Sequence, residues 1–144
     1  MESNDTICLL KKCDAGTKMA ISSIDEVIDY VCDLKFRELL TKSKEQHEKI
    51  STELQSLLEK NGSEEKEPSS IAKGMFWLKT NFKISMNESD STIADLITEG
   101  CNMGIKTLNK YQNQYKEADT ASSSLCKRLI SIEEDLCKGV RCYL

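Results

Sequence analysis

The sequence predicts an all-α fold, an antiparallel four-helix bundle in which a long crossover carrying an extra helix joins two helical hairpins. Apolar residues recur at steps of three and four over four long stretches, which is the spacing of one helix face. One Pro and six Gly in 144 residues are too few for a protein of strands and turns. A polar interval divides the four stretches into two pairs. We expect a single bundle domain over residues 1–144.

The first two helices are expected over about residues 5–34 and 36–60. Neither Gly nor Pro separates them, so the turn at residues 32–35 must be tight, and one very long helix is the alternative. Gly62 suits the left-handed position that follows a helix, which marks the end of the second one. The two apolar stripes consist of Leu10, Cys13, Thr17, Ala20, Ile24, Val27, Val31 and Leu34, and of Phe36, Leu40, Ser43, His47, Ile50, Leu54 and Leu57.

A shorter helix is expected over about residues 70–86, after the polar linker of residues 61–70. The interval up to residue 90 is too long for a hairpin turn and suits a crossover that travels the length of a bundle. Phe76 and Trp77 add bulk beside the stripe, so the helix is apolar on more than one face. We expect Trp77 to pack against the bundle and the remaining apolar surface to be covered in a twofold homodimer or by a protein partner.

The last two helices are expected over about residues 91–118 and 121–143. Asp90 or Ser91 can cap the first of them, because a short side-chain oxygen accepts a backbone N–H at a helix start. Gly100 and Gly104 lie on its apolar stripe, one turn apart, which favours close packing of a neighbouring backbone; room for a ligand is the alternative. A cap for the last helix is expected within residues 120–123.

Composition and charge exclude several classes of function. A net charge of −4 disfavours non-specific nucleic-acid binding, which needs a basic surface. No apolar run reaches the roughly 18 residues of a membrane span. The acidic start does not resemble a secretory signal. Seven scattered cysteines without a C-x-x-C pair indicate free thiols in a reducing, cytoplasmic setting. We therefore expect no nucleic-acid or membrane partner.

The stretch from residue 74 to residue 115 resembles a known family. Trp77 and Lys79 end an aromatic-rich crossover helix, and a short turn of Ser, Asn and Asp follows. The next helix has a TEGCNMG centre and then Tyr111. This is similar to an uncharacterised bacterial family, a domain of unknown function in the ferritin-like superfamily. The resemblance covers most of the chain and implies a ferritin-like bundle and dimerisation, but no activity.

Ferritin-like bundles often hold two metal ions between their helices. The ligands are one Glu from each of two helices and a Glu-x-x-His motif from each of the other two. This chain has one histidine, His47, and the residue three before it is Lys44. Leu136 follows Glu133 at the corresponding spacing. Both Glu-x-x-His motifs are therefore absent, and we predict no metal site and no cofactor.

Four residues near the predicted seam could still be remnants of a site: Asp14, His47, Glu99 and Glu133. The interpretation we favour is that the acids are charges at the edge of the stripe and that His47 is a core residue bonded to a neighbour. No motif orients a Cys–His pair or cradles a phosphate, so we predict no catalytic residue. Two hypotheses of function follow. The first is a non-enzymatic helical module that acts by dimerisation or partner binding, and the alternative is a degenerate ferritin-like protein that handles metals or oxidants.

Overall fold

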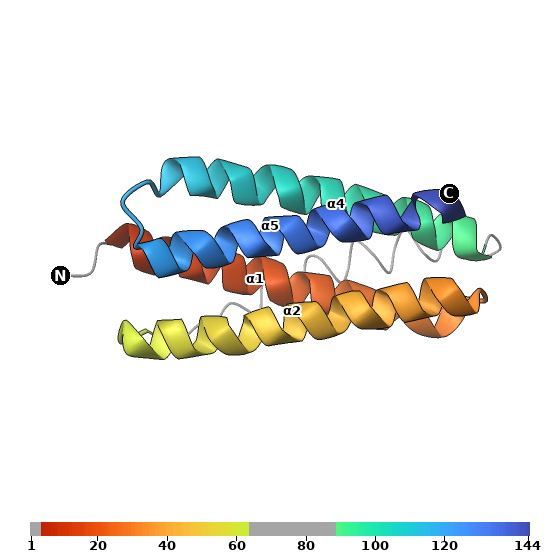
Figure 1. Cartoon of the computed structure of the whole chain (residues 1–144), viewed down its shortest axis with the longest axis horizontal. Helices are drawn as coiled ribbons and strands as arrows, with labels where there is room; N and C mark the ends of the chain where they lie inside the picture. The colour runs from red at the N-terminus through yellow and green to blue at the C-terminus, as the bar shows by residue number, and fades with distance from the viewer. Residues whose placement is uncertain (1–3, 64–88) are drawn as a thin grey trace.

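The computed structural model describes residues 4–63 and 89–144, so the helix expected at residues 70–86, with Trp77, lies outside the described residues. The described residues form an all-α four-helix bundle without a strand (Figure 1). Its elements are α1 (Asn4–Val27), the 3₁₀-helical turn η1 (Ile28–Tyr30), α2 (Leu34–Lys60), α4 (Ser89–Gln114), α5 (Thr120–Val140) and the 3₁₀-helical turn η2 (Arg141–Tyr143).

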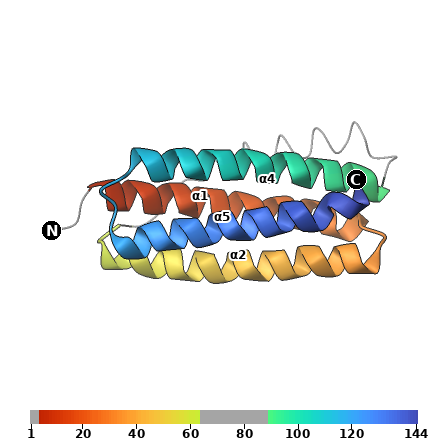
Figure 2. The same ribbon diagram turned by 45° about the horizontal axis from the view of Figure 1, so that its top comes forward.

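Neighbouring helices of the bundle are antiparallel. The colours show that α1 and α5 run in one direction and that α2 and α4 run in the other (Figures 1 and 2). Each of α1 and α5 packs against both α2 and α4. The end of α2 and the beginning of α4 lie at opposite ends of the bundle (Figure 1). The sequence-based prediction of an all-α four-helix bundle with antiparallel pairings is thus confirmed.

The first two helices are separate, and the first is shorter than expected. After α1 and η1, Val31 is extended, with φ −75° and ψ 125°. The Asp33 carboxylate then accepts the backbone N–H of Phe36 at 2.9 Å, so Asp33 caps α2. One long helix from residue 5 to residue 60 is therefore wrong. At the other end of α2, Gly62 has a φ of 74°, the left-handed conformation expected of a residue that ends a helix.

Asp90 does not act as the expected cap of α4. The helix begins at Ser89, so Asp90 lies within its first turn. The Asp90 carboxylate accepts the backbone N–H groups of Cys32 at 2.8 Å and Asp33 at 2.9 Å. Both donors belong to the turn between α1 and α2, where they have no helical partner. Asp90 therefore ties the start of α4 to the first hairpin.

A second set of backbone contacts joins α1 to the turn between α4 and α5. The Asp5 carboxylate accepts the N–H of Glu117 at 3.0 Å, and the Thr6 hydroxyl accepts the N–H of Asp119 at 2.8 Å. Asp119 in turn caps α5 by accepting the N–H of Ser122 at 2.8 Å. This cap lies one residue before the range expected from the sequence. Hydrogen bonds thus link the turns to neighbouring helices at both ends of the bundle.

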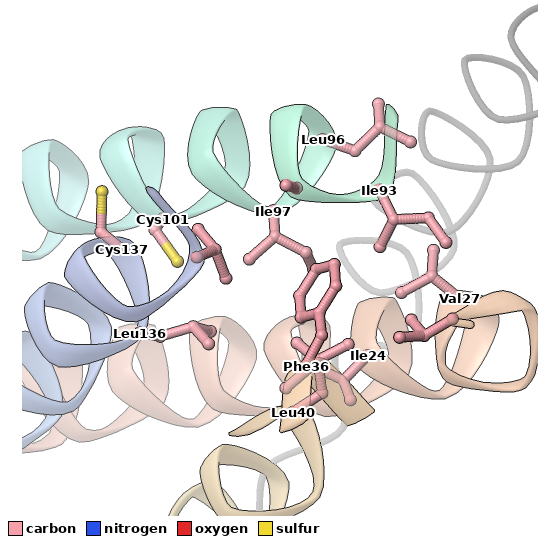
Figure 3. Packing of buried hydrophobic residues seen from close by; sticks show 13 residues of the cluster. Ile24, Val27, Phe36, Leu40, Ile93, Leu96, Ile97, Cys101, Leu136 and Cys137 are labelled. Atoms are coloured by element: carbon pink, nitrogen blue, oxygen red, sulfur yellow. The ribbon is translucent and has the colours of Figure 1, made fainter. Parts of the chain in front are cut away.

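The buried apolar residues form two clusters along the bundle axis. Phe36 is central to the first cluster, which lies near the α1–α2 turn (Figure 3). Its ring stacks on Tyr143 with 4.4 Å between the ring centroids. The first cluster consists of Ile24, Val27, Val31, Phe36, Leu40, Ile93, Ala94, Leu96, Ile97, Cys101, Leu136, Cys137 and Val140. The second consists of Leu9, Leu10, Cys13, Ile50, Leu54, Leu58, Leu108, Leu125, Cys126, Leu129 and Ile130.

The glycines of α4 do not mark the close approach expected of them. Gly100 is exposed, and a Cβ added there would meet no atom within 4 Å. At Gly104 the added Cβ would lie 3.7 Å from the Glu133 carboxylate, an ordinary contact distance. The close approach occurs instead at Gly139 of α5, where an added Cβ would lie 2.9 Å from the Leu39 side chain of α2.

Candidate functional site

A polar layer lies between the two apolar clusters. In α1, α2 and α5, the buried residues between the two clusters are polar, and Gly104 lies on the corresponding part of α4. We call five of these residues the central layer: Thr17 of α1, Ser43 and His47 of α2, Gly104 of α4 and Glu133 of α5. The hydroxyl of Thr17 donates to the carbonyl of Cys13 at 2.8 Å, the bond to the preceding turn that a helical Thr commonly forms.

His47 and Glu133 meet inside the bundle. The imidazole of His47 is fully buried, and its Nε2 lies 3.2 Å from Oε1 of Glu133. Its Nδ1 lies 2.7 Å from the backbone carbonyl oxygen of Ser43. A carbonyl oxygen only accepts hydrogen bonds, so Nδ1 must carry a hydrogen and donate it. The contact between Nε2 and the carboxyl group then needs one shared proton.

Opposing effects act on the pKa of His47. Burial lowers this pKa, because it disfavours the charged ring. The hydrogen bond and the negative charge of Glu133 raise it, as does the bond to the Ser43 carbonyl. The net result is a pKa above the ordinary histidine value. The arrangement therefore favours an imidazolium that donates to both of its partners.

The thiol of Cys101 also belongs to the surroundings of Glu133. Burial raises the pKa of Cys101, and the charge of Glu133 and its hydrogen bond with the thiol raise it further. A thiol with a raised pKa stays protonated at neutral pH, whereas the thiolate is the reactive form. Cys101 is thus a buried donor and is not an activated nucleophile.

Two of the four candidate residues from the sequence come together, and two do not. Asp14 is fully buried away from His47, with Oδ2 at 2.8 Å from the ammonium nitrogen of Lys18 in an ion pair that lacks hydrogen-bond geometry. Its Oδ1 accepts from the Gln55 side chain at 3.4 Å. Glu99 is exposed on α4. The interpretation of Glu99 as an edge charge fits its position, but Asp14 and Glu133 are core residues.

The described residues contain no group of three or more His, Cys, Asp and Glu side chains arranged to hold a metal ion. His47 and Glu133 could supply two ligands between them, but each already binds the other. Sequence reasoning missed Lys18 and Cys101. Lys18 could have been found from its position one turn after Asp14, and Cys101 from its place on the α4 stripe.

Two grooves on the described surface run along α2 and are open to solvent. One is lined by Leu34, Arg37, Glu38, Thr41, Lys42 and Glu45, and the other by Leu39, Lys42, Ser43, Gln46, Asp135 and Leu136. Neither groove is lined by His47 or Glu133. The central pair is therefore reached from neither groove.

Comparison of the chain with protein families, with curated proteins and with solved structures gives no match. The class that the fold defines is thus an all-α four-helix bundle, and the ferritin-like family named from the sequence stays a prediction. Among residues 4–63 and 89–144, no helix is long and apolar enough to cross a membrane.

Proposed function

We propose that this chain is a non-enzymatic helical module that acts by forming a homodimer, and that the partner copy covers apolar surface at one end of the bundle. The observation that carries the proposal is the exposure of large apolar side chains there. Tyr30 is 58% exposed and Leu34 is 71% exposed, and both lie at the α1–α2 turn. Leu144 is exposed at the same end of the bundle (Figure 1). We call Tyr30, Leu34 and Leu144 the end patch.

The chemistry of the interior supports a role without catalysis. His47 and Glu133 are hydrogen-bonded to each other, and the pKa of the Cys101 thiol is raised. All seven cysteines are free, which supports the proposed cytoplasmic setting. A soluble protein that exposes grouped apolar side chains commonly covers them by twofold self-association. The apolar residues of the 70–86 stretch would add to such an interface.

Light scattering at high micromolar concentration tests the dimer. We expect twice the chain mass for the unmodified protein and the chain mass for Leu34→Lys, because the substitution places a charge in the end patch. Met103→Lys is the matched control, since Met103 is 61% exposed but lies in the middle of α4. It should leave the dimer intact. A monomer mass for the unmodified protein would contradict the proposal.

The second candidate is a degenerate ferritin-like protein that handles metals or oxidants. The helix directions favour it, because the residues between α2 and α4 must connect opposite ends of the bundle, as a ferritin-like crossover does. The position of His47 and Glu133 midway along the bundle favours it too, because ferritin-like metal ligands project into the bundle core. The finer fold that we propose is therefore a ferritin-like bundle with a crossover helix over about residues 70–86.

Metal analysis separates the two candidates. A di-metal centre in this fold takes about six ligands from four helices, whereas the central layer offers one His and one Glu. We expect protein purified without chelator to carry no stoichiometric iron, manganese or zinc, and His47→Ala to leave the metal content unchanged. Close to two metal ions per chain, lost in His47→Ala, would refute the non-enzymatic proposal and support the second candidate.

A further inference from the structure

The contact between His47 and Glu133 joins the two halves of the bundle. His47 belongs to the α1–α2 hairpin and Glu133 to the α4–α5 hairpin. The same two helices are also joined by Arg128 and Glu53, whose paired bonds of 2.7 and 2.8 Å lie at the surface. Water and salt screen a surface pair of this kind. The His47–Glu133 contact is shielded, because it lies between two apolar clusters.

This contact requires one proton between its two groups. The Ser43 carbonyl fixes a hydrogen on Nδ1 of His47, so Nε2 carries a lone pair whenever the ring is neutral. With the proton present, one group donates and the other accepts. With the proton absent, the lone pair faces a carboxylate at 3.2 Å, where the His47 ring is fully buried and the Glu133 side chain is only 9% exposed. A buried polar contact of that kind is costly.

The other charged and titratable groups nearby are occupied by their own partners. On α1, the Asp14 carboxylate faces the Lys18 ammonium at 2.8 Å. On α4, the Cys101 thiol donates a hydrogen bond to the carboxylate of Glu133. On α2 itself, the Lys44 ammonium lies 2.6 Å from the Asp25 carboxylate of α1. Glu133 of α5 is therefore the group that balances a charge on His47.

We propose that the His47–Glu133 contact is a pH-sensitive fastening between the two hairpins, which holds the bundle together while it keeps its proton and loosens the bundle when alkaline pH removes that proton. The geometry carries this inference, because both ring nitrogens face oxygen acceptors in a buried layer. The inference is independent of the proposed dimer, since it concerns contacts within one chain.

The pKa of His47 is raised, and this direction determines whether the stabilising contact is lost at acidic or at alkaline pH. A group whose folded pKa exceeds its unfolded value adds stability below the unfolded value, which is about 6.5 for histidine. That stability is lost as the pH rises through the folded pKa. The pKa of His47 is raised, so the loss begins above pH values of about 6.5.

Nuclear magnetic resonance of the unmodified protein is the first test. The chain has one histidine, so its imidazole signals need no assignment by mutation. We expect a titration midpoint above the free histidine value and two protonated ring nitrogens at pH 6. A midpoint at or below about 6.5 would overturn the proposal. This readout uses the folded chain and does not depend on any variant.

The second test compares two substitutions that each remove one negative charge from α5. In Glu133→Gln the carboxamide can donate to a neutral Nε2, so the contact no longer needs the proton. We expect its urea midpoint not to fall between pH 6 and 8.5, while that of the unmodified protein does. Glu134→Gln, at the exposed neighbouring position, should keep the unmodified pH profile. Equal profiles for Glu133→Gln and the unmodified protein would refute the proposal.

Discussion

The ion pair between Asp14 and Lys18 gives a prediction whose size follows from the burial of its two members. Asp14 is 0% exposed and Lys18 is 30% exposed, with 2.8 Å between the charged atoms. Lys18→Met keeps most of the side-chain stem but removes the ammonium. The Asp14 carboxylate would then be buried with the Gln55 amide as its remaining polar partner among the described contacts.

Two limits bracket the cost of Lys18→Met. Removing one partner of a fully buried ion pair costs about 3–5 kcal/mol, because the remaining charge stays buried without compensation. Losing an exposed pair costs about 0.2–1 kcal/mol. Water reaches Lys18 but does not reach Asp14, so we expect a loss in the free energy of unfolding of about 2–3 kcal/mol, between those limits.

Urea denaturation at pH 7 measures this loss. The double variant Asp14→Asn, Lys18→Met should regain most of it, because Asn needs no balancing charge and can still accept from Gln55. Lys11→Met, at an exposed position of the same helix, should change the free energy by no more than about 0.5 kcal/mol. If Lys18→Met matched Lys11→Met, or if the double variant were no more stable than Lys18→Met, the reasoning would be wrong.

Two further predictions concern the end of the bundle near the α1–α2 turn. Phe36→Ala should lower the free energy of unfolding by about 3–5 kcal/mol, because Phe36 is fully buried and its ring stacks on Tyr143. A loss below about 1 kcal/mol in thermal unfolding would contradict that packing. Asp90→Ala should cost about 1–2 kcal/mol, because two backbone N–H groups lose a charged acceptor that is only partly buried. Asp95→Ala, exposed on the same helix, is its control, and equal urea midpoints for the two variants would count against the contact.

The sequence predicts where the helices lie better than where they end. Apolar periodicity places α2 and α5 closely, because most of the free energy of a bundle helix comes from burial of one face. Helix ends depend on which short polar side chain reaches a free N–H. Asp33 and Asp119 make such contacts, whereas Asp90 bonds to a turn that lies far away in the sequence. Local patterns do not distinguish these cases.

The central contact depends on information that the sequence pattern does not contain. The stripe of α2 includes His47, and Glu133 lies beside the stripe of α5, so the sequence indicates both as candidates. Their pairing joins residues 86 positions apart and requires the axial alignment of two helices from different hairpins. The sequence indicates Glu99 as a candidate just as it does Glu133, and yet Glu99 is exposed. The burial of Glu133 therefore reflects its tertiary partner more than its residue type.

A buried ion pair need not make the bundle more stable than an apolar pair of the same volume would. Its position nevertheless discriminates between alignments of α2 and α5. Sliding α5 along α2 would bring Glu133 towards Ile50 after one helical turn, about 5.4 Å, in one direction, or towards Leu40 after two turns in the other. Either slide would also leave the His47 ring without its acceptor. A buried carboxylate among apolar side chains costs several kcal/mol, so the contact disfavours misaligned hairpins.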